Sequence, residues 1–208
     1  MSNQKKHLAV LASGSGTNLQ AVIDAIKNNK LKDTEISIVI SNKLNAYALE
    51  RAKKEGINSI FINPSDFKTN LEFDKKIVEV LSNYCIDLII LAGYTKILSI
   101  ELINTFSNKI INIHPALLPN FGGKGMYGQN VHKAVLESNT KETGCTVHYV
   151  TEEVDAGPII AQRKVPVLSN DTIETLSNRV LQEEHKILPE AIELVLFNQK
   201  ALQNTYNT

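Results

Sequence analysis

The chain has 208 residues, and its 22 basic and 22 acidic residues cancel to a formal net charge of zero. Hydrophobic residues make up 43% of it, an ordinary share for a globular protein, which excludes a wholly disordered chain. The balanced charge, with no basic run longer than a pair, argues against a protein that binds nucleic acid.

Two cysteines, Cys85 and Cys145, are too few and too far apart for a disulfide framework or a CxxC metal site. The first apolar stretch, residues 7–12, is shorter than the apolar region of a signal peptide, and no run approaches the roughly 20 apolar residues of a membrane span. No histidine pair has metal-ligand spacing. We therefore expect a cytoplasmic protein that uses no metal and binds no membrane.

Short apolar runs alternate with helical patterns through the first half of the chain. The runs predict five strands, at residues 7–13, 35–41, 58–63, 87–93 and 109–114. The spacing of apolar residues predicts helices at 18–28, 46–55 and 71–82. Strand–helix alternation with strands that are apolar throughout predicts a mostly parallel, twisted sheet flanked by helices, an α/β fold.

The pattern changes after Pro115. A loop is expected at 119–130, a helix at 131–138, two strands at 145–151 and 159–167, and a helix from 171 to about 198 that Pro189 should kink. The two strands form a C-terminal antiparallel extension to the sheet. With no linker-like stretch, we expect one domain, 1–208, with lobes at 1–100 and 101–208.

The first predicted strand runs into a glycine turn, ASGSGTN at residues 12–18. Backbone N–H groups at such a turn can hold an anion at the start of the next helix. A dinucleotide fingerprint would need a third glycine where Leu19 stands and an acid where Ser41 and Asn42 stand. The turn therefore favours the phosphate of a small substrate over NAD, and an ordinary tight turn remains the alternative.

The fifth predicted strand ends in INIHP, residues 111–115. Residues two apart on a strand point the same way, so Asn112 and His114 share one face. Burying polar groups in such an apolar strand costs free energy unless they form hydrogen bonds, so their presence suggests a function. At the carboxyl end of a central parallel strand, an amide N–H and an imidazole can together hold an oxyanion, as carbonyl addition requires.

Asp155 is the one carboxylate of VDAGP, and by itself it would be an ordinary turn residue. For His148, within TVHYV, the sequence leaves three roles open: a structural residue, a residue that supports the site, or a surface residue. His132 and His185 lie in helical settings, and no serine or cysteine nucleophile motif is present.

Five segments together resemble the phosphoribosylglycinamide formyltransferases: SGSGTNLQAVID (13–24), LAGYTKILS (91–99), INIHPALLP (111–119), VTEEVDAGPII (150–160) and LQEEHKILP (181–189). They follow in order from about residue 7 to 197. The NIHP and DxGP segments are typical of the wider group of enzymes that act on 10-formyltetrahydrofolate. The GxGTN turn narrows the resemblance to the enzymes that use glycinamide ribonucleotide, and it implies a Rossmann-like formyltransferase fold.

The resemblance implies site residues position by position. The catalytic residues would be Asn112, His114 and Asp155. The residues for glycinamide ribonucleotide would be Gly16, Thr17, Asn18, Leu181, Gln182, Glu183 and Glu184, the first three at the phosphate. The residues for the folate would be Asn70, Thr95, Lys96, Ile97, Leu98, Asn112, Thr151, Glu152, Glu153, Val154 and Asp155.

The resemblance also implies the chemistry, in de novo purine synthesis. The amine of the ribonucleotide attacks the formyl carbon of 10-formyltetrahydrofolate, a cosubstrate, and tetrahydrofolate leaves. Asn112 and protonated His114 would stabilise the oxyanion. We expect Asp155 to raise the pKa of His114, because a nearby carboxylate favours the charged imidazole. The expected partners are small molecules only, and the chain would be a monomer or a homodimer.

Two positions depart from the family pattern. Asn70, with Lys68 nearby, stands where the family often has an arginine that contacts the folate tail. The segment FGGKGMYG, residues 121–128, is several residues longer than the usual loop, and its glycines make mobility plausible.

Three alternatives stay open. A methionyl-tRNA formyltransferase would carry a further C-terminal domain, and a formyltetrahydrofolate deformylase an extra N-terminal one, so the length of 208 residues disfavours both. A non-catalytic nucleotide-binding module would explain the glycine turn but not Asn112 beside His114.

Overall fold

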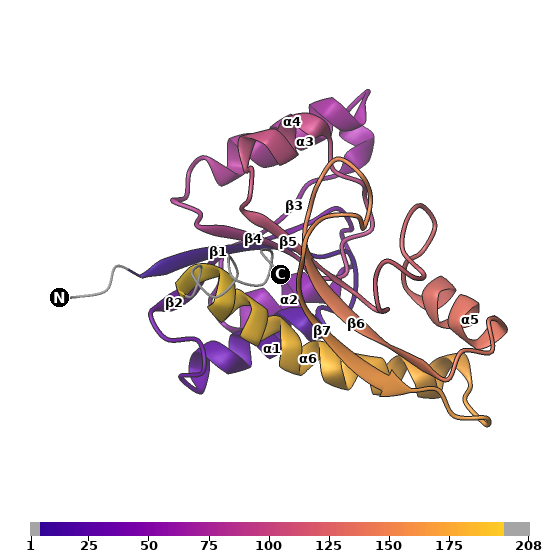
Figure 1. Cartoon of the computed structure of the whole chain (residues 1–208). Coiled ribbons are helices and arrows are strands. Elements are labelled where there is room, and N and C mark those ends of the chain that lie inside the picture. Colours follow the sequence, from indigo (N-terminus) through magenta and orange to yellow (C-terminus); the bar gives the residue numbers. More distant parts are fainter. Residues whose placement is uncertain (1–4, 198–208) are drawn as a thin grey trace. The chain divides into compact units, whose positions relative to one another are not determined.

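The computed structural model describes residues 5–197 of the chain, which form two compact units (Figure 1). The first unit ends at Ile111 and the second begins at Asn112, so the division falls within a strand, β5 (Ile110–His114). Hydrogen-bonded neighbours in the sheet follow the order β3-β2-β1-β4-β5-β6-β7.

The first unit alternates strands and helices. Its strands are β1 (Lys6–Leu11), β2 (Thr34–Ser41), β3 (Ser59–Phe61) and β4 (Leu88–Leu91). Its helices are α1 (Thr17–Lys27), α2 (Tyr47–Lys54), the 3₁₀ helix η1 (Pro64–Asp66), α3 (Asn70–Leu81) and α4 (Ile100–Thr105). β1 pairs in parallel with both β2 and β4, and β2 with β3. β1 and β4 bury nearly all their side chains, as strands covered on both faces must.

The second unit contains the end of β5, α5 (Gln129–Glu137), β6 (Glu142–Tyr149), β7 (Ile159–Pro166) and α6 (Ile173–Phe197). β6 and β7 are antiparallel, with an irregularity between Val147 and His148. Their backbones approach closely at Gly144, where a Cβ would lie 1.9 Å from the carbonyl oxygen of Arg163. The long α6 packs along β6 and β7 (Figure 1).

The predicted fold class is confirmed: a seven-stranded, mostly parallel sheet with an antiparallel extension, flanked by helices and with a long C-terminal helix. The prediction missed α4 and η1. It also began β6 at residue 145 rather than at Glu142, because a Glu-Thr-Gly start lacks the apolar signal of a strand. α6 continues through Pro189, and the predicted helix end at 198 lies outside the described residues.

Among the helices of residues 5–197, none combines the length and apolar character that crossing a membrane requires.

Candidate active site

β5 brings an amide and an imidazole to its carboxyl end. Its isoleucines are buried, Asn112 is half-buried, and His114 is only 3% exposed. Pro115 follows at once; it has no N–H to extend the ladder, so the regular strand stops at the two polar residues. The strand thus presents Asn112 and His114 on one face, as the alternation predicts.

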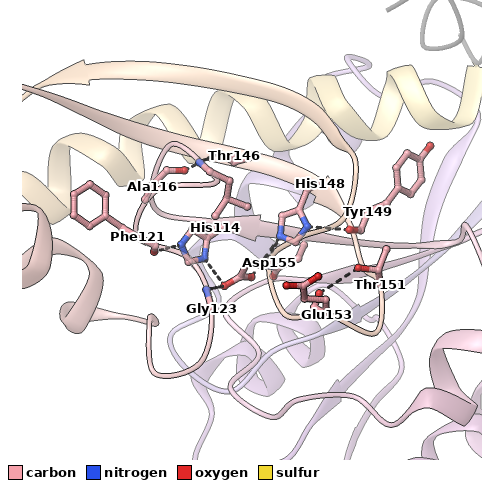
Figure 2. Close-up of polar contacts among 12 residues, drawn as sticks. His114, Ala116, Phe121, Gly123, Thr146, His148, Tyr149, Thr151, Glu153 and Asp155 are labelled. Atoms are coloured by element: carbon pink, nitrogen blue, oxygen red, sulfur yellow. Dashed lines mark hydrogen bonds and ion pairs between the residues drawn. The ribbon is translucent and has the colours of Figure 1, made fainter. Parts of the chain in front are cut away.

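Both ring nitrogens of His114 face oxygen atoms. Nε2 lies 2.8 Å from the carbonyl oxygen of Phe121, and Nδ1 lies 3.5 Å from Oδ2 of Asp155 (Figure 2). A carbonyl oxygen only accepts, so Nε2 carries a proton and donates it to Phe121. The second nitrogen, Nδ1, therefore faces the carboxylate, which favours a second proton there when the ring becomes charged.

Asp155 reaches His114 from the turn between β6 and β7. The turn is closed tightly at Gly157, where a Cβ would lie 1.8 Å from the carbonyl oxygen of Tyr149. Within it, the hydroxyl of Thr151 donates to the carbonyl of Glu153 at 3.2 Å (Figure 2). Asp155 itself has φ of 57°, a left-handed conformation that aspartate tolerates better than most residues. The turn thereby directs the carboxylate at the end of β5.

The pKa values of the pair depend on burial and on contacts. Burial, the largest cause, lowers the pKa of His114 below its usual value, although Asp155 and the Phe121 carbonyl raise it. Burial raises the pKa of Asp155, but contacts with His148, His114 and the N–H of Gly123 together bring it below its usual value. Asp155 thus raises the pKa of His114, as expected, but burial outweighs it and the net shift of that pKa is downward. At neutral pH the pair is a neutral imidazole beside an ionised carboxylate.

His148 completes the site, and the sequence left its role open. The amide Nδ2 of Asn112 lies 3.1 Å from Nε2 of His148, and Nδ1 of His148 lies 2.9 Å from the carbonyl oxygen of Tyr149. Because that carbonyl only accepts, Nδ1 carries a proton; in the neutral ring Nε2 accepts from Asn112, and in the charged ring Nε2 carries a second proton. Nε2 also lies 3.6 Å from Oδ1 of Asp155. We call Asn112, His114, His148 and Asp155 the β5 cluster.

Thr146, which the sequence analysis also missed, fixes the chain just after β5. Its buried hydroxyl donates to the carbonyl of Ala116 at 2.6 Å and accepts from the N–H of Leu118 at 3.1 Å (Figure 2). Gln162 donates from Nε2 to the Thr146 hydroxyl and to the Leu118 carbonyl, both at 2.9 Å. A polar alternation in β6, Thr146 then His148 between apolar residues, was the available signal for both.

In the first unit, the glycine turn begins α1 without a capping side chain. Gly16 is the N-cap residue, with φ of 69°, and a Cβ there would lie 2.7 Å from Cα of Ala48. The first N–H groups of α1 therefore lack a side-chain acceptor from the cap residue. Arg51 lies at this turn and donates from Nε to the carbonyl of Ser15 at 2.8 Å. Asn18 is buried and Thr17 half-buried.

The segment from Tyr94 to Ser99, also in the first unit, is held by several side chains. Asn70 donates from Nδ2 to the carbonyl of Ile97 at 3.0 Å, and the N–H of Thr95 donates to the Ser13 hydroxyl at 2.9 Å. The N–H of Ser99 donates to the carboxylate of the buried Asp74. Lys96 lies over the ring of Phe73, at 5.0 Å. Sequence analysis missed Asp74, because this residue of α3 accepts a hydrogen bond from Ser99, the N-cap residue of α4.

The remaining predicted positions lie in the second unit. On α6, Glu184 is buried, Leu181 is half-buried, and Gln182 is exposed. Glu183 forms ion pairs with Lys186 at 2.7 Å and Arg163 at 3.4 Å. In the turn before Asp155, Glu152 and Glu153 are exposed while Val154 is half-buried.

Similarity to known proteins decides the family. A family model described as formyl transferase matches residues 6–192 of the chain. The chain belongs to the formyl transferase family. The resemblance inferred from the motifs is thereby confirmed.

Several relatives of this formyl transferase carry names that specify a reaction. The phosphoribosylglycinamide formyltransferase of Escherichia coli (strain K12) is 40% identical over 183 residues, which cover 88% of this chain and 84% of that protein. The trifunctional purine biosynthetic protein adenosine-3 of Homo sapiens is 46% identical over 192 residues, covering 92% of this chain but 18% of that protein. This chain therefore corresponds to a small part of the human relative.

Solved structures agree with the family fold. Glycinamide ribonucleotide transformylase 1 from Symbiobacterium toebii has a TM-score of 0.87 at 42% identity, covering 93% of this chain and 88% of that one. The corresponding protein from Geobacillus kaustophilus has a TM-score of 0.86 at 38% identity, covering 93% and 100%.

Proposed function

We propose that this formyl transferase moves the formyl group of 10-formyltetrahydrofolate to the amine of 5′-phosphoribosylglycinamide. The products would be 5′-phosphoribosyl-N-formylglycinamide and tetrahydrofolate, a step of purine biosynthesis. The names of the relatives support this choice of substrates. The observation that carries the proposal is the β5 cluster, in which an amide, two imidazoles and an ionised carboxylate are in mutual contact.

The cluster supplies what addition of an amine to a formyl carbonyl needs. One N–H of the Asn112 amide is directed to His148, which leaves the other for the oxyanion of the tetrahedral intermediate. The N–H at Nε2 of His114 would be the second donor, shared between the oxyanion and the Phe121 carbonyl that accepts it in the structure. A single donor of this kind is typically worth about 10²–10³ in kcat.

The proton balance follows from the same groups. A new C–N bond forms between the amine and the formyl carbon, the bond to N10 breaks, and one proton passes from the attacking amine to N10. The developing negative charge favours the imidazolium form of His114. The ionised Asp155 beside Nδ1 stabilises that form, which offsets the lowering of the His114 pKa by burial.

Substrate contacts are proposed for the positions the family pattern implies. Backbone N–H groups of Gly16, Thr17 and Asn18 would hold the phosphate, because the start of α1 favours negative charge. Leu181, Gln182, Glu183 and Glu184 would contact the ribose and glycinamide. Thr95 to Leu98 would contact the pterin of the folate; Ile97, which is 54% exposed, offers an apolar surface for it. Asn70 and residues 151–155 complete the proposed folate contacts.

One assay tests the proposal. The protein is mixed with 10-formyltetrahydrofolate, with and without glycinamide ribonucleotide, and tetrahydrofolate and formylated ribonucleotide are measured. Formation of both products only when the amine is present is expected. Consumption of the folate without the amine would indicate a hydrolase, and no consumption in either mixture would contradict an enzyme of this group.

A further inference from the structure

Residues 121–128, which we call the glycine loop, follow β5. The backbone of this loop makes two contacts with the β5 cluster that the proposed reaction does not explain. The carbonyl of Phe121 accepts from Nε2 of His114 at 2.8 Å, and the N–H of Gly123 donates to Oδ2 of Asp155 at 2.9 Å (Figure 2). One short stretch thus contacts both members of the imidazole–carboxylate pair.

The first contact decides where the proton of the neutral imidazole resides. A hydrogen bond made by one ring nitrogen selects the tautomer, and here the Phe121 carbonyl keeps the proton on Nε2. Nδ1, which faces Asp155, is then unprotonated in the neutral ring and accepts the second proton when the ring becomes charged. With the other tautomer, Nε2 would have no proton to offer an oxyanion.

The second contact acts on the carboxylate. The N–H of Gly123 bonds to the same oxygen, Oδ2, that faces Nδ1 of His114. Hydrogen bonding to the charged form of a carboxylate favours that form. The contact therefore keeps Asp155 ionised and fixes the oxygen that the imidazole must meet.

Gly122 allows both contacts because it has no side chain. A Cβ at this position would lie 2.5 Å from Cδ2 of Leu118 and 3.2 Å from Cβ of Asp155. The first distance is far too short for two carbon atoms, and the buried Leu118 side chain, 5% exposed, has little free space into which Cδ2 could rotate. We therefore expect a larger residue at 122 to push the loop away from the pair.

We propose that Phe121 to Gly123 form a positioning segment for catalysis: their backbone sets the tautomer of His114 and the orientation of Asp155, and Gly122 is the residue that permits this approach. The inference rests on the proposed formyl transfer for its kinetic consequence. Its structural content, the protonated Nε2 of His114, does not depend on which substrate is used.

The kinetic test is Gly122→Ala. Misplacing the pair by about 1 Å should lower kcat by about 10²-fold while KM for both substrates changes little. Lys124→Ala is the matched control, since Lys124 is exposed in the same loop. The control should keep the parent kcat. An unchanged kcat in Gly122→Ala would overturn the proposal.

A second substitution tests the cause. Leu118→Val removes the Cδ2 atom that an alanine at 122 would meet. The double variant Leu118→Val with Gly122→Ala should recover kcat to within about threefold of Leu118→Val alone, because the two sites share one contact and their effects are not additive. Failure of this rescue, with both proteins folded, would contradict the steric argument.

A measurement without substrate separates this inference from the proposed function. The ¹⁵N spectrum of the histidine rings at pH 8 should show His114 protonated at Nε2 in the parent protein and exchanging between tautomers in Gly122→Ala. The charged or titratable groups facing His114 are Asp155, His148 and His132, so the spectrum is compared at one fixed pH.

The two failures are distinguishable. If the parent protein is inactive but His114 is protonated at Nε2, the proposed reaction is contradicted and the structural part of the positioning proposal is supported. A parent His114 protonated at Nδ1, or tautomers already in exchange, would overturn the inference whatever the activity, and this result needs no variant to fold.

Discussion

Asp155 in the second unit, half-buried, and Asp74 in the first, buried, both accept a backbone N–H, from Gly123 and Ser99 respectively. Their pKa values nevertheless move in opposite directions. Burial raises the pKa of Asp74 above its usual value, and its hydrogen bonds from Ser99 do not compensate. At Asp155 the effect of burial is reversed by His148, His114 and Gly123.

The difference lies in the partners of the second carboxylate oxygen. Oδ1 of Asp155 faces Nε2 of His148 at 3.6 Å, whereas Oδ1 of Asp74 has no hydrogen-bond partner among residues 5–197. The buried hydroxyl of Tyr94 also lacks a partner there, and Asp74 adds to the burial that raises the pKa of Tyr94. The contacts with Ser99 thus do not offset the effect of burial on the pKa of Asp74, whereas the N–H of Gly123 and the two nearby imidazoles together do so at Asp155.

The largest expected effect comes from removing the charge of Asp155, the carboxylate with more stabilising contacts. Asp155→Asn should lower kcat at least about 10²-fold, the typical value of one stabilising group at an oxyanion site. The pKa of His114 should also fall further, because the one carboxylate that raises it is gone. Steady-state kinetics and a ¹⁵N titration of the ring measure the two results. Asp24→Asn, at an exposed position on α1, is the control; parent-like turnover in Asp155→Asn would contradict the role.

Removing the second imidazole should give a smaller loss. His148→Phe keeps a ring of similar shape but leaves Nδ2 of Asn112 and the carbonyl of Tyr149 without their partners. Unsatisfied buried polar groups cost about 1–3 kcal/mol, so a fall in kcat of about tenfold is expected as Asn112 reorients. His148→Gln, whose carbonyl oxygen can accept from Asn112, should recover part of it. Equal activities in the two variants would show that the hydrogen bond is not what matters.

Asp74→Asn should affect stability through pH rather than activity. Asp74 binds its proton more readily in the native state than in the unfolded state, because its pKa is raised on folding. The stability of the parent protein therefore rises as the pH falls through the folded pKa of Asp74 toward its unfolded pKa of about 4. The advantage of the asparagine variant should therefore be largest at pH 8 and shrink at pH 5. Urea unfolding at both values measures it.

Asp155→Asn provides the contrast within the same experiment. With its folded pKa lowered, Asp155 contributes stability that is present above the unfolded pKa and lost only as the pH falls through the folded value. The part of this stability that comes from the carboxyl should stay constant from pH 8 to 5, while the lower pKa of His114 in the variant adds a loss of stability toward pH 5. At pH 8 Asp155→Asn should be less stable than the parent, whereas Asp74→Asn should be more stable. The same sign for both variants at pH 8 would remove the distinction between the two carboxylates.

The smallest effect is expected for Lys96→Met. Lys96 is the nearby cation that lowers the pKa of Asp74, so its removal should raise that pKa further and move the pH dependence of stability to higher pH. Methionine keeps an apolar contact over the ring of Phe73. The double variant Lys96→Met with Asp74→Asn should show no such movement, and a shift that persists in it would point to another titrating group.

The sequence predicted the sheet well because β1 from Leu8 onward and all of β4 are apolar, and β2 places an isoleucine or valine at most of its positions from Ile36 to Ile40. Such runs can be seen in the local sequence alone. It missed α4, whose six residues are too short for a helical period to be visible, although Ser99 accepts from the N–H of Leu102 as an N-cap does. It began β6 late because residues 142–144 are ordered by pairing with residues 164–166 of β7 rather than by an apolar local pattern.

In the site, the convergence of Asp155 on His114 agrees with the sequence-based expectation, whereas His148 and Asp74 were left unassigned. Each of these two acts through a hydrogen bond to a residue far along the chain, Asn112 and Ser99, which no local spacing reveals. The raising effect of Asp155 on the His114 pKa could be inferred from the sequence, but the larger lowering by burial could not, because burial is a property of the packed molecule.

The arrangement of the glycine loop has a consequence for protein engineering. Its start is bonded through Leu118 to Thr146, and Phe121 and Gly123 are bonded to the imidazole–carboxylate pair, whereas Lys124, Gly125 and Tyr127 are exposed. Insertions should therefore be accommodated between Lys124 and Gly128. A peptide tag or a fluorescent probe grafted there would report on the loop from its outer end, while even one extra residue before Gly123 would shift the register of both contacts.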